Sequence, residues 1–284
     1  MSTPQPSAYL SHLPPRARWL LGVARLTLAE PAEAVDRTLV RVREAVGNRP
    51  SRVEYEAEPA WEEWLHRQLG AAWPCPARAE FEALWPEVAD YVRRQGLAFG
   101  RASYGGCDDA DPGLARALWC LTAHLRPEKV VETGVAHGVT SRFILERLRR
   151  NGTGYLWSID LPDVDVTRHG QIGAAVPPEL RERWTLIEGT SRHRLEPLLE
   201  ELGGIDLFLH DSSHTERNVR FELARAWQAL GRGAIVVDDV HRNRSWEAFT
   251  RVQTQASAVT AYADDRGALF GIALKPAVND SPKG

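Results

Sequence analysis

Two short runs of acidic and histidine residues could do chemistry in the second half of the chain. The first is HDSSH at residues 210–214, and the second is DDVH at residues 238–241. Each run follows an apolar stretch typical of a buried strand. Crowded carboxylates repel one another and raise one another's pKa, and a divalent cation removes that cost. Oxygen ligands suit Mg²⁺, Ca²⁺ or Mn²⁺, so we expect a metal at Asp211, Asp238 and Asp239.

Adjacent residues of a strand point to opposite faces, so this metal site depends on the local backbone. Asp238 and Asp239 share a metal only where the strand already turns, which makes Asp239 the favoured ligand of the two. The competing interpretation is that the aspartates cap loops or hold a ligand without a metal. The histidines add possible general bases for deprotonating a hydroxyl. We name His241 first and His214 second, with Asp211 as a third candidate catalytic residue.

A glycine turn near the middle of the chain is the second candidate feature. It lies in the segment KVVETGVAHGVTSRFILERLRR, where an apolar run ends in Glu132 and a turn with Gly134 and Gly138 precedes a helical pattern. A dinucleotide motif would need further glycines at Ala136 and Ser141. A carboxylate just before the turn is awkward for a pyrophosphate and suits a cationic ligand. S-adenosylmethionine (SAM) carries an ammonium and a sulfonium and has no phosphate.

The spacing E-x-G-x-x-x-G resembles the first motif of class I SAM-dependent methyltransferases. The resemblance implies an acid at the end of the second strand, and Asp160 stands there to accept ribose hydroxyls. It also implies that the loop after the third strand reaches the adenine, although Thr190 or Ser191 could instead cap the next helix. The SAM-binding residues implied in this way are Glu132, Gly134, Ala136, Gly138, Ser141, Asp160, Leu161, Gly189, Thr190, Ser191 and Asp211.

The acidic runs sharpen the resemblance. Catechol O-methyltransferase-like enzymes carry an Asp after strand four and Asp-Asn after strand five; Asp211 and Asp239 match, but Val240 replaces the Asn. The chain is more similar to metal-dependent natural-product and sugar O-methyltransferases, including the cephalosporin hydroxylase-like and macrolide sugar families. In the sugar enzymes the position of His241 holds the general base. The resemblance covers Leu114–Leu274 and implies Mg²⁺-dependent O-methylation of a small metabolite, with a sugar-like acceptor possible.

Other functions fit parts of the same pattern. A metal-independent methyltransferase could act on N or O with the aspartates in other roles. A non-catalytic SAM-binding subunit could use its helical N-terminal region for assembly. An NAD-dependent oxidoreductase shares the architecture, but the missing glycines count against it.

Strands and amphipathic helices alternate from Lys129 onward. This pattern predicts an α/β fold: a Rossmann-like, seven-stranded, mostly parallel sheet with helices on both faces. The last two strands flank a turn at Asp264–Gly267, which indicates a hairpin. The predicted strands are Lys129–Thr133, Tyr155–Asp160, Trp184–Glu188, Asp206–His210, Ala234–Val237, Val259–Ala263 and Leu269–Leu274.

The rest of the chain divides around this sheet. We expect residues 1–111 to form a helical N-terminal region that covers the sheet, acts as a lid or mediates oligomerisation. Residues 112–276 would be the SAM-binding domain, and residues 277–284 a disordered tail. The loop Phe99–Asp111 is either a connection or a lid. Helices are expected at Arg16–Val46, with a break at Pro31, and at Trp61–Leu69, Phe81–Arg94 and Pro112–Leu125.

Composition narrows the class further. The net charge of −3 over 284 residues gives no reason to expect a nucleic-acid partner. No apolar run suggests a membrane span or a signal peptide. Cys75, Cys107 and Cys120 are odd in number and lack metal-type spacing, which favours a reduced, cytoplasmic protein. We expect a small-molecule substrate and a homo-oligomer.

Overall fold

The computed structural model describes residues 13–29, 31–32, 34–35, 53–101, 103–104, 108–109, 111–161 and 166–276. Three parts of the prediction lie outside the described residues: the second part of the first helix, apart from a few positions near Pro31, the cysteine at position 107 and the tail that was expected to be disordered. No helix in the described parts of the chain is long and apolar enough to cross a membrane.

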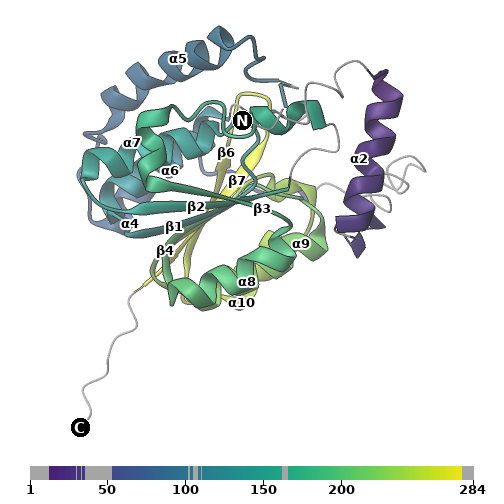
Figure 1. The fold of residues 1–284 in the computed structure, drawn as a ribbon. Helices are drawn as coiled ribbons and strands as arrows, with labels where there is room; N and C mark the ends of the chain where they lie inside the picture. The colour runs from purple at the N-terminus through teal and green to yellow at the C-terminus, as the bar shows by residue number, and fades with distance from the viewer. Residues whose placement is uncertain are drawn as a thin grey trace.

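Seven strands form one sheet in the order β3-β2-β1-β4-β5-β7-β6 (Figure 1). Strands β1 to β5 are parallel, and β7 is antiparallel to both β5 and β6. The predicted fold class is therefore confirmed, including the terminal hairpin. The strands span Lys129–Thr133 (β1), Tyr155–Asp160 (β2), Trp184–Glu188 (β3), Ile205–His210 (β4), Leu230–Val237 (β5), Ser257–Tyr262 (β6) and Leu269–Lys275 (β7).

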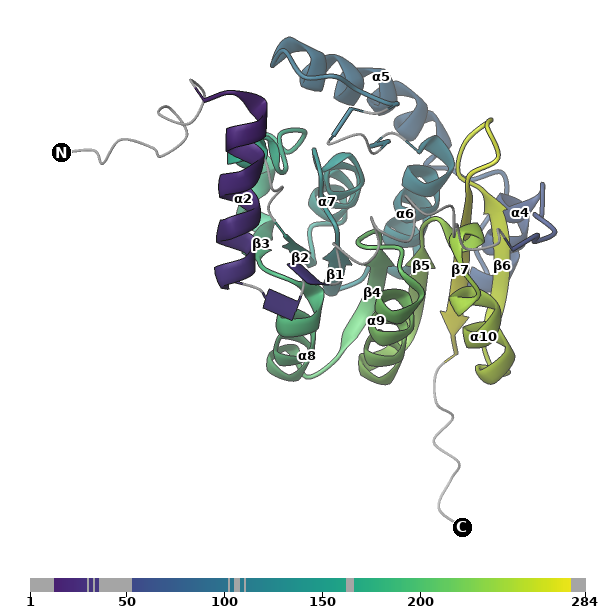
Figure 2. The same cartoon turned by 90° about the vertical axis from the view of Figure 1, so that its right-hand side faces the viewer.

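Helices cover both faces of the sheet, as Figures 1 and 2 show. Successive strand residues point to opposite faces, so Val130 joins the core beneath α6 and α7 while Val131 joins the core above α8 and α9. The helices are α4 (Trp61–Leu69), α5 (Arg78–Arg94), α6 (Pro112–Leu125), α7 (Val139–Asn151), α8 (Ser191–Leu202), α9 (Glu216–Ala229) and α10 (Ser245–Val252), with 3-10 turns at Val166–Gln171, Pro178–Arg183 and Val240–Arg242.

The N-terminal helices pack on this framework to different degrees. Helices α4 and α5 share the core of α6 and α7, where Leu65 and Phe81 are buried together with Trp119 and Phe143. The Trp119 indole donates a hydrogen bond to the carbonyl of Ala77 at 2.9 Å. Helix α2 (Pro15–Ala29) lies apart from the helices that cover the sheet (Figures 1 and 2).

The strand order reverses direction at the centre of the sheet, where β1 lies between β2 and β4. In open α/β sheets, ligands bind at such a switch point, outside the carboxyl ends of the strands. The parallel register places Thr133 beside His210 and His210 beside Val237. The residues that follow β1, β4 and β5 therefore emerge side by side at one edge.

Candidate active site

The turn between β1 and α7 is built on glycine. Gly134 has a φ of 85°, and a Cβ there would lie 2.0 Å from the backbone oxygen of Asp211. Gly138 has a φ of 80°, and its Cβ would lie 3.0 Å from the Cα of Gly173. Ala136 also has a positive φ, 49°, which is uncommon for a residue with a side chain. At Gly134 the turn is therefore in close contact with the backbone that follows β4.

Asp160, at the end of β2, holds this turn from the side. One oxygen of its carboxylate, Oδ2, accepts hydrogen bonds from the backbone N–H groups of Val135 and Ala136, both at 3.0 Å. Its backbone oxygen accepts from the N–H of Gly189 at 2.9 Å. Leu161 follows directly and is partly buried. The glycine turn, the carboxylate of Asp160 and the loop at Gly189 therefore lie together at the carboxyl ends of β1, β2 and β3.

Glu132 lies behind the turn, in the interior. Its carboxylate is fully buried and accepts hydrogen bonds from Thr140 at 2.8 Å and from Ser141 and Ser158 at 2.6 Å. Burial raises the pKa of Glu132 to about 7, although the three hydroxyls act to lower it. The sequence placed Glu132 against a cationic ligand, and the resemblance implied that Ser141 also binds SAM. In the structure both are used to join β1, β2 and α7.

The loop after β3 caps the next helix. The Thr190 hydroxyl accepts a hydrogen bond from the backbone N–H of His193 at 3.3 Å, so Thr190 is the N-cap of α8. Ser191 donates to the side-chain oxygen of Asn218 at 3.3 Å. The capping interpretation is thus confirmed for Thr190, and Ser191 links α8 to α9.

Acidic side chains converge where β4 and β5 end. The ligand atoms of Asp211, His214 and Asp238 all lie within 4.8 Å of one another. Burial raises the pKa of both Asp211 and Asp238 well above the usual range. Repulsion from Asp238 adds to the shift at Asp211, and repulsion from Asp239 and Asp111 adds to the shift at Asp238. One oxygen of Asp238 and Nδ1 of His214 are buried with no hydrogen-bond partner among the described residues. We call Asp211, His214 and Asp238 the acid–histidine cluster.

The chain turns at Asp239, which has a φ of 52°. Its Oδ2 lies 3.2 Å from the guanidinium of Arg242 and 3.5 Å from Nε2 of His214. The sequence favoured Asp239 over Asp238 as a metal ligand because the two were expected to point apart. In the structure Asp238 is the one within the cluster, while Asp239 pairs with Arg242 at its rim.

The two candidate bases flank these acids. Nε2 of His214 lies 3.8 Å from Asp238, and burial lowers the pKa of His214 well below its usual range, so the ring is neutral near pH 7. His241 is buried, and its Nδ1 accepts a long 3.4 Å hydrogen bond from the backbone N–H of Leu269. That nitrogen lies 3.8 Å from the carboxylate of Asp239.

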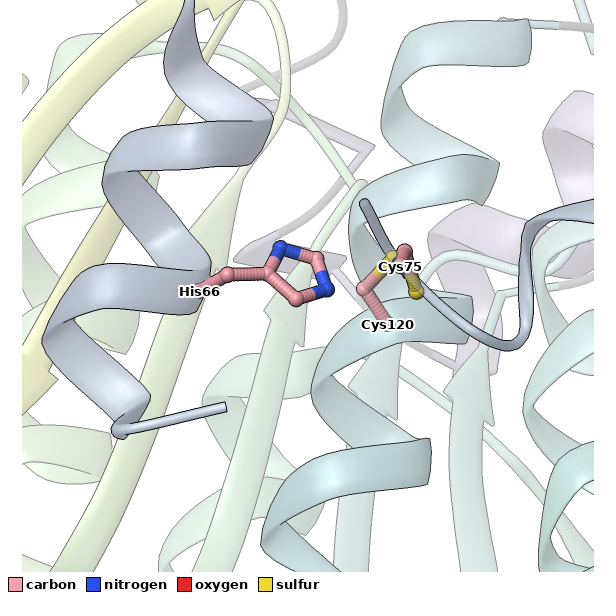
Figure 3. Close-up of side chains that lie close together, drawn as sticks. All are labelled: His66, Cys75 and Cys120. Atoms are coloured by element: carbon pink, nitrogen blue, oxygen red, sulfur yellow. Dashed lines mark hydrogen bonds between the residues drawn. The ribbon is translucent and has the colours of Figure 1, made fainter. Parts of the chain in front are cut away.

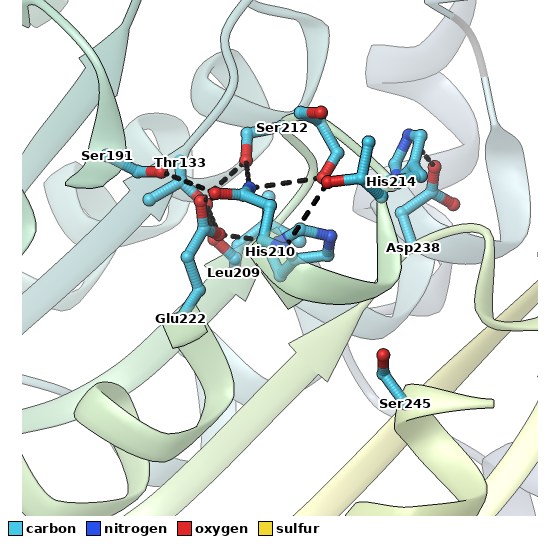
Figure 4. A network of polar contacts seen from close by, with 12 residues as sticks. Thr133, Ser191, Leu209, His210, Ser212, His214, Glu222, Asp238 and Ser245 are labelled. Carbon is cyan, nitrogen blue, oxygen red and sulfur yellow. Dashed lines mark hydrogen bonds and ion pairs between the residues drawn. The ribbon is translucent and has the colours of Figure 1, made fainter. Parts of the chain in front are cut away.

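A buried network ties the ends of β1 and β4 to α9 (Figure 4). Its centre is Glu222, which accepts hydrogen bonds from Thr133 at 2.5 Å and Ser212 at 2.7 Å and pairs with Nδ1 of His210 at 2.5 Å. Burial acts to raise the pKa of Glu222, but His210 and the hydroxyl donors outweigh it and lower the pKa to about 2. The network keeps the loop before the acid–histidine cluster in one position.

Comparisons with known proteins agree with this arrangement. Residues 131–240 match the family model described as a methyltransferase domain, a segment that runs from β1 to just after the acids of β5. The match identifies residues 131–240 as a methyltransferase domain.

Solved structures show the same fold. A candidate O-methyltransferase from Klebsiella pneumoniae is similar with a TM-score of 0.51 and 18% identity over 77% of this chain and 97% of that one. A candidate caffeoyl-CoA O-methyltransferase from Staphylococcus aureus gives a TM-score of 0.50 and 11% identity over 76% and 98%. No curated protein sequence matches the chain significantly.

Two acidic residues that were not singled out from the sequence also lie at this end of the sheet. Asp111, the residue before α6, belongs to the same acidic neighbourhood: burial, then the carboxylates of Asp264 and Asp239, raise its pKa to about 6. Glu222 lies in a helix, twelve residues after His210, and nothing in its local pattern marks it as buried. Asp111 could have been suspected from its position just before the predicted helix.

The loop that precedes α6 is attached to the glycine turn. Asp109 pairs with His137 of the turn and also accepts a hydrogen bond from the N–H of Gly100 at 2.9 Å. The ring of Tyr104 packs edge-on against His137 at 5.1 Å. This loop was expected to be a connection or a lid, and its described residues contact the turn directly.

Proposed function

We propose that this protein transfers a methyl group from SAM to a hydroxyl of a small metabolite or natural product, with a divalent metal, Mg²⁺, at the acid–histidine cluster. One observation carries the proposal. The glycine turn packs against the backbone of Asp211, so a donor bound at the turn lies next to the cluster. A sugar-like acceptor is compatible with this chemistry, because a sugar offers neighbouring hydroxyls that can bind a metal.

The proposed binding site for the donor is the glycine turn after β1, together with the ends of β2 and β3. Asp160 fixes the turn through two backbone N–H groups, and Gly134 allows the close approach of the chain after β4. A carboxylate at the end of the second strand is suited to ribose hydroxyls. The loop at Gly189 and Thr190 would lie along the adenine. Glu132 would not contact the donor directly, because its carboxylate is buried behind the turn; it would instead stabilise the position of the turn.

The residues present fit a divalent metal. Asp211 and Asp238 supply carboxylate oxygens, His214 supplies a ring nitrogen, and a buried oxygen of Asp238 has no partner within the described chain. When bound, the ion would hold the acceptor oxygen and lower the pKa of its hydroxyl. Burial and repulsion from neighbouring carboxylates raise the pKa values of Asp211 and Asp238, and a bound cation would offset both. Asp239 and Asp111 add negative charge nearby.

The remaining requirement is a proton acceptor. Methyl transfer from a sulfonium is an in-line displacement: the acceptor oxygen forms a bond to the methyl carbon as the carbon–sulfur bond breaks, and the hydroxyl proton must leave. His241 is our first choice for the base and His214 the second. His214 is neutral at pH 7 and so able to take a proton, but it also lies within metal-binding distance of Asp238.

A metal-independent methyltransferase is the second candidate function. Two observations favour it: Asp211 and Asp238 both have raised pKa values and could share one proton, and Arg242 already partners Asp239. In that case the acids would orient the acceptor, and transfer to N as well as O would be open.

The region before the domain has a proposed role in covering and assembly. Helices α4 and α5 cover α6 and α7, which supports the cover. Helix α2 exposes Leu20, Leu21 and Leu28, with 61%, 49% and 86% of their surface accessible, which supports a homo-oligomer through this helix. We further propose that residues 112–276 are the SAM-binding unit and that the protein acts in the cytoplasm.

Ligand binding and chelation test the proposed function. Calorimetry should show micromolar binding of SAM or S-adenosylhomocysteine and no binding of NAD. Once an acceptor is found, EDTA should abolish turnover and Mg²⁺ or Mn²⁺ should restore it. His241→Ala should lower kcat and leave the affinity for S-adenosylhomocysteine unchanged, since a base acts in the chemical step. Tight NAD binding without SAM binding would overturn the proposal, and full activity in EDTA would leave the metal-independent function.

A further inference from the structure

A second cluster of possible metal ligands lies far from the acids, between the N-terminal helices and the domain. Figure 3 shows His66 of α4 pointing toward Cys75, in the segment before α5, and Cys120 of α6. His124 lies one turn after Cys120 on the same helix. The spacing of the cysteines along the chain gave no sign of a metal site. Folding brings the four side chains together.

The distances fit the edges of a tetrahedral zinc site. Zinc binds thiolate sulfur at about 2.3 Å and imidazole nitrogen at about 2.0 Å, so two sulfurs stand about 3.8 Å apart and a sulfur and a nitrogen about 3.5 Å apart. The sulfurs of Cys75 and Cys120 are 3.6 Å apart, and the Cys75 sulfur is 3.6 Å from Nε2 of His124. The ligand atoms of His66, Cys75 and Cys120 lie within 4.8 Å of one another.

The orientation of His66 is that of a metal ligand. Its Nδ1 lies 2.6 Å from the backbone carbonyl of Glu62, and this contact requires a proton on Nδ1. The lone pair is then on Nε2, which is buried and has no hydrogen-bond partner among the described residues. His66 itself is fully buried. Zinc-ligating histidines commonly donate their second nitrogen to a carbonyl in this way, because it fixes the tautomer and the ring.

The two thiols are not joined in a disulfide. Their 3.6 Å separation is far above the S–S bond length of about 2.05 Å, and both cysteines are free and buried. Buried polar groups without a partner are costly, so an orphaned imidazole beside two thiols calls for a ligand.

We propose that His66, Cys75, Cys120 and His124 form a structural zinc site. A Cys₂His₂ set is one of the common structural combinations and is softer than the oxygen-rich cluster of the active site. The ring of Trp73 lies 5.2 Å from the ring of His66 and helps to close the site. The ion would fasten α4 and the segment before α5 to α6, and so hold the N-terminal cover on the domain.

Metal analysis of the full-length protein, with any affinity tag removed, tests this site. Purified under reducing conditions with added zinc and then passed through gel filtration, the protein should retain about one zinc per chain. His66→Ala and Cys75→Ser should each lower retained zinc at least tenfold. His193→Ala, which removes an exposed histidine on α8, is the matched control and should keep the zinc. Asp238→Asn should keep it too, because that residue belongs to the acid–histidine cluster.

A measurement on the unaltered chain covers the case in which these variants fail to fold. Cobalt(II) bound in place of zinc should give the intense visible bands of tetrahedral coordination and a thiolate-to-cobalt charge-transfer band. Four outcomes would overturn the proposal: no retained zinc in the wild-type protein, zinc lost from Asp238→Asn but kept in Cys75→Ser, an octahedral cobalt spectrum without the thiolate band, or a mass about 2 Da lower from a Cys75–Cys120 disulfide.

Discussion

Two halves of one sheet edge are built in opposite ways. At the ends of β1 and β2, the chain satisfies its own carboxylates: Glu132 accepts three hydroxyl hydrogen bonds, and Asp160 accepts two from backbone N–H groups. At the ends of β4 and β5, burial and neighbouring carboxylates raise the pKa of both Asp211 and Asp238, and an oxygen of Asp238 has no partner in the described chain. We call the first the donor half, after its role in the proposed function, and the second the acid half. The buried carboxylates of the donor half have hydrogen-bond partners within the chain, whereas an oxygen of Asp238 in the acid half has none among the described residues.

The difference shows which buried carboxylates are stabilised by the chain itself and which would be stabilised by a bound cation or proton. Satisfied buried groups hold a single geometry, which suits a binding surface that must be ready for the donor. Crowded acids keep an electrostatic cost that is removed only when a cation or a proton enters. Glu222 forms hydrogen bonds with Thr133 of β1 and His210 of β4, so it connects the two halves and stabilises their relative position.

The largest expected effect tests the donor half. Gly134→Ala should weaken binding of S-adenosylhomocysteine by at least about 100-fold, because the new Cβ would meet the backbone of Asp211 at 2.0 Å. Calorimetry measures the loss. Gly152→Ala is the matched control: this glycine also has a positive φ, 73°, but a Cβ there meets nothing within 4 Å. Equal affinities in the two variants would show that the tight approach at Gly134 does not form the binding edge.

The next effect tests the acid half. Asp238→Asn should weaken Mn²⁺ binding by about 10- to 100-fold, and Asp239→Asn by less, because only Asp238 lies within the cluster. Electron paramagnetic resonance of free Mn²⁺ measures the binding. In metal-free protein, Asp238→Asn should raise the melting temperature, since it removes a charge from a repelling pair. A lower melting temperature without metal would mean that the acid half is as well satisfied as the donor half.

Local patterns predicted most of the fold, and the exceptions have physical causes. Alternating apolar runs located all seven strands. The start of β5 was predicted at Ala234, but the strand begins at Leu230. Its first half contains Gly231, Arg232 and Gly233, which do not form an apolar run, so the pattern did not reveal it. A side chain at Gly233 would meet the backbone of Asp206 at 1.9 Å, a constraint that no local pattern reveals.

The site was predictable only where function follows from strand ends. Asp160 ends β2, and Asp211 and Asp238 directly follow β4 and β5, so their convergence could be expected from topology. The roles of Glu132 and Glu222 could not, because they depend on hydroxyls contributed by other elements. The zinc ligands of the second cluster are separated by up to 58 positions (from 66 to 124), and only the packing of α4 on α6 brings them together.

Glu132 gives a smaller effect that depends on pH. Its pKa is about 7 in the folded protein, compared with 4.5 for an ordinary glutamate, so between these values the folded chain carries the extra proton. The free energy of unfolding should therefore fall as pH rises from about 4.5 to 7, by about 3 kcal/mol relative to Glu132→Gln. Urea unfolding of both proteins across this range measures the difference. Parallel pH profiles would contradict the buried, raised pKa of Glu132.

The smallest effect compares two equivalent helix caps, one in each half. Thr190 caps α8 and Thr215 caps α9, and each hydroxyl accepts a backbone N–H at 3.3 Å. Thr190→Ala and Thr215→Ala should each cost about 1 kcal/mol of stability, because each leaves one helix-terminal N–H without its partner. Only Thr190→Ala should also weaken S-adenosylhomocysteine, by severalfold, since its loop borders the donor half. Only Thr215→Ala should weaken Mn²⁺, since it follows His214. Urea unfolding and the two binding assays separate these outcomes, and equal losses of both ligands in both variants would show that the halves are not independent.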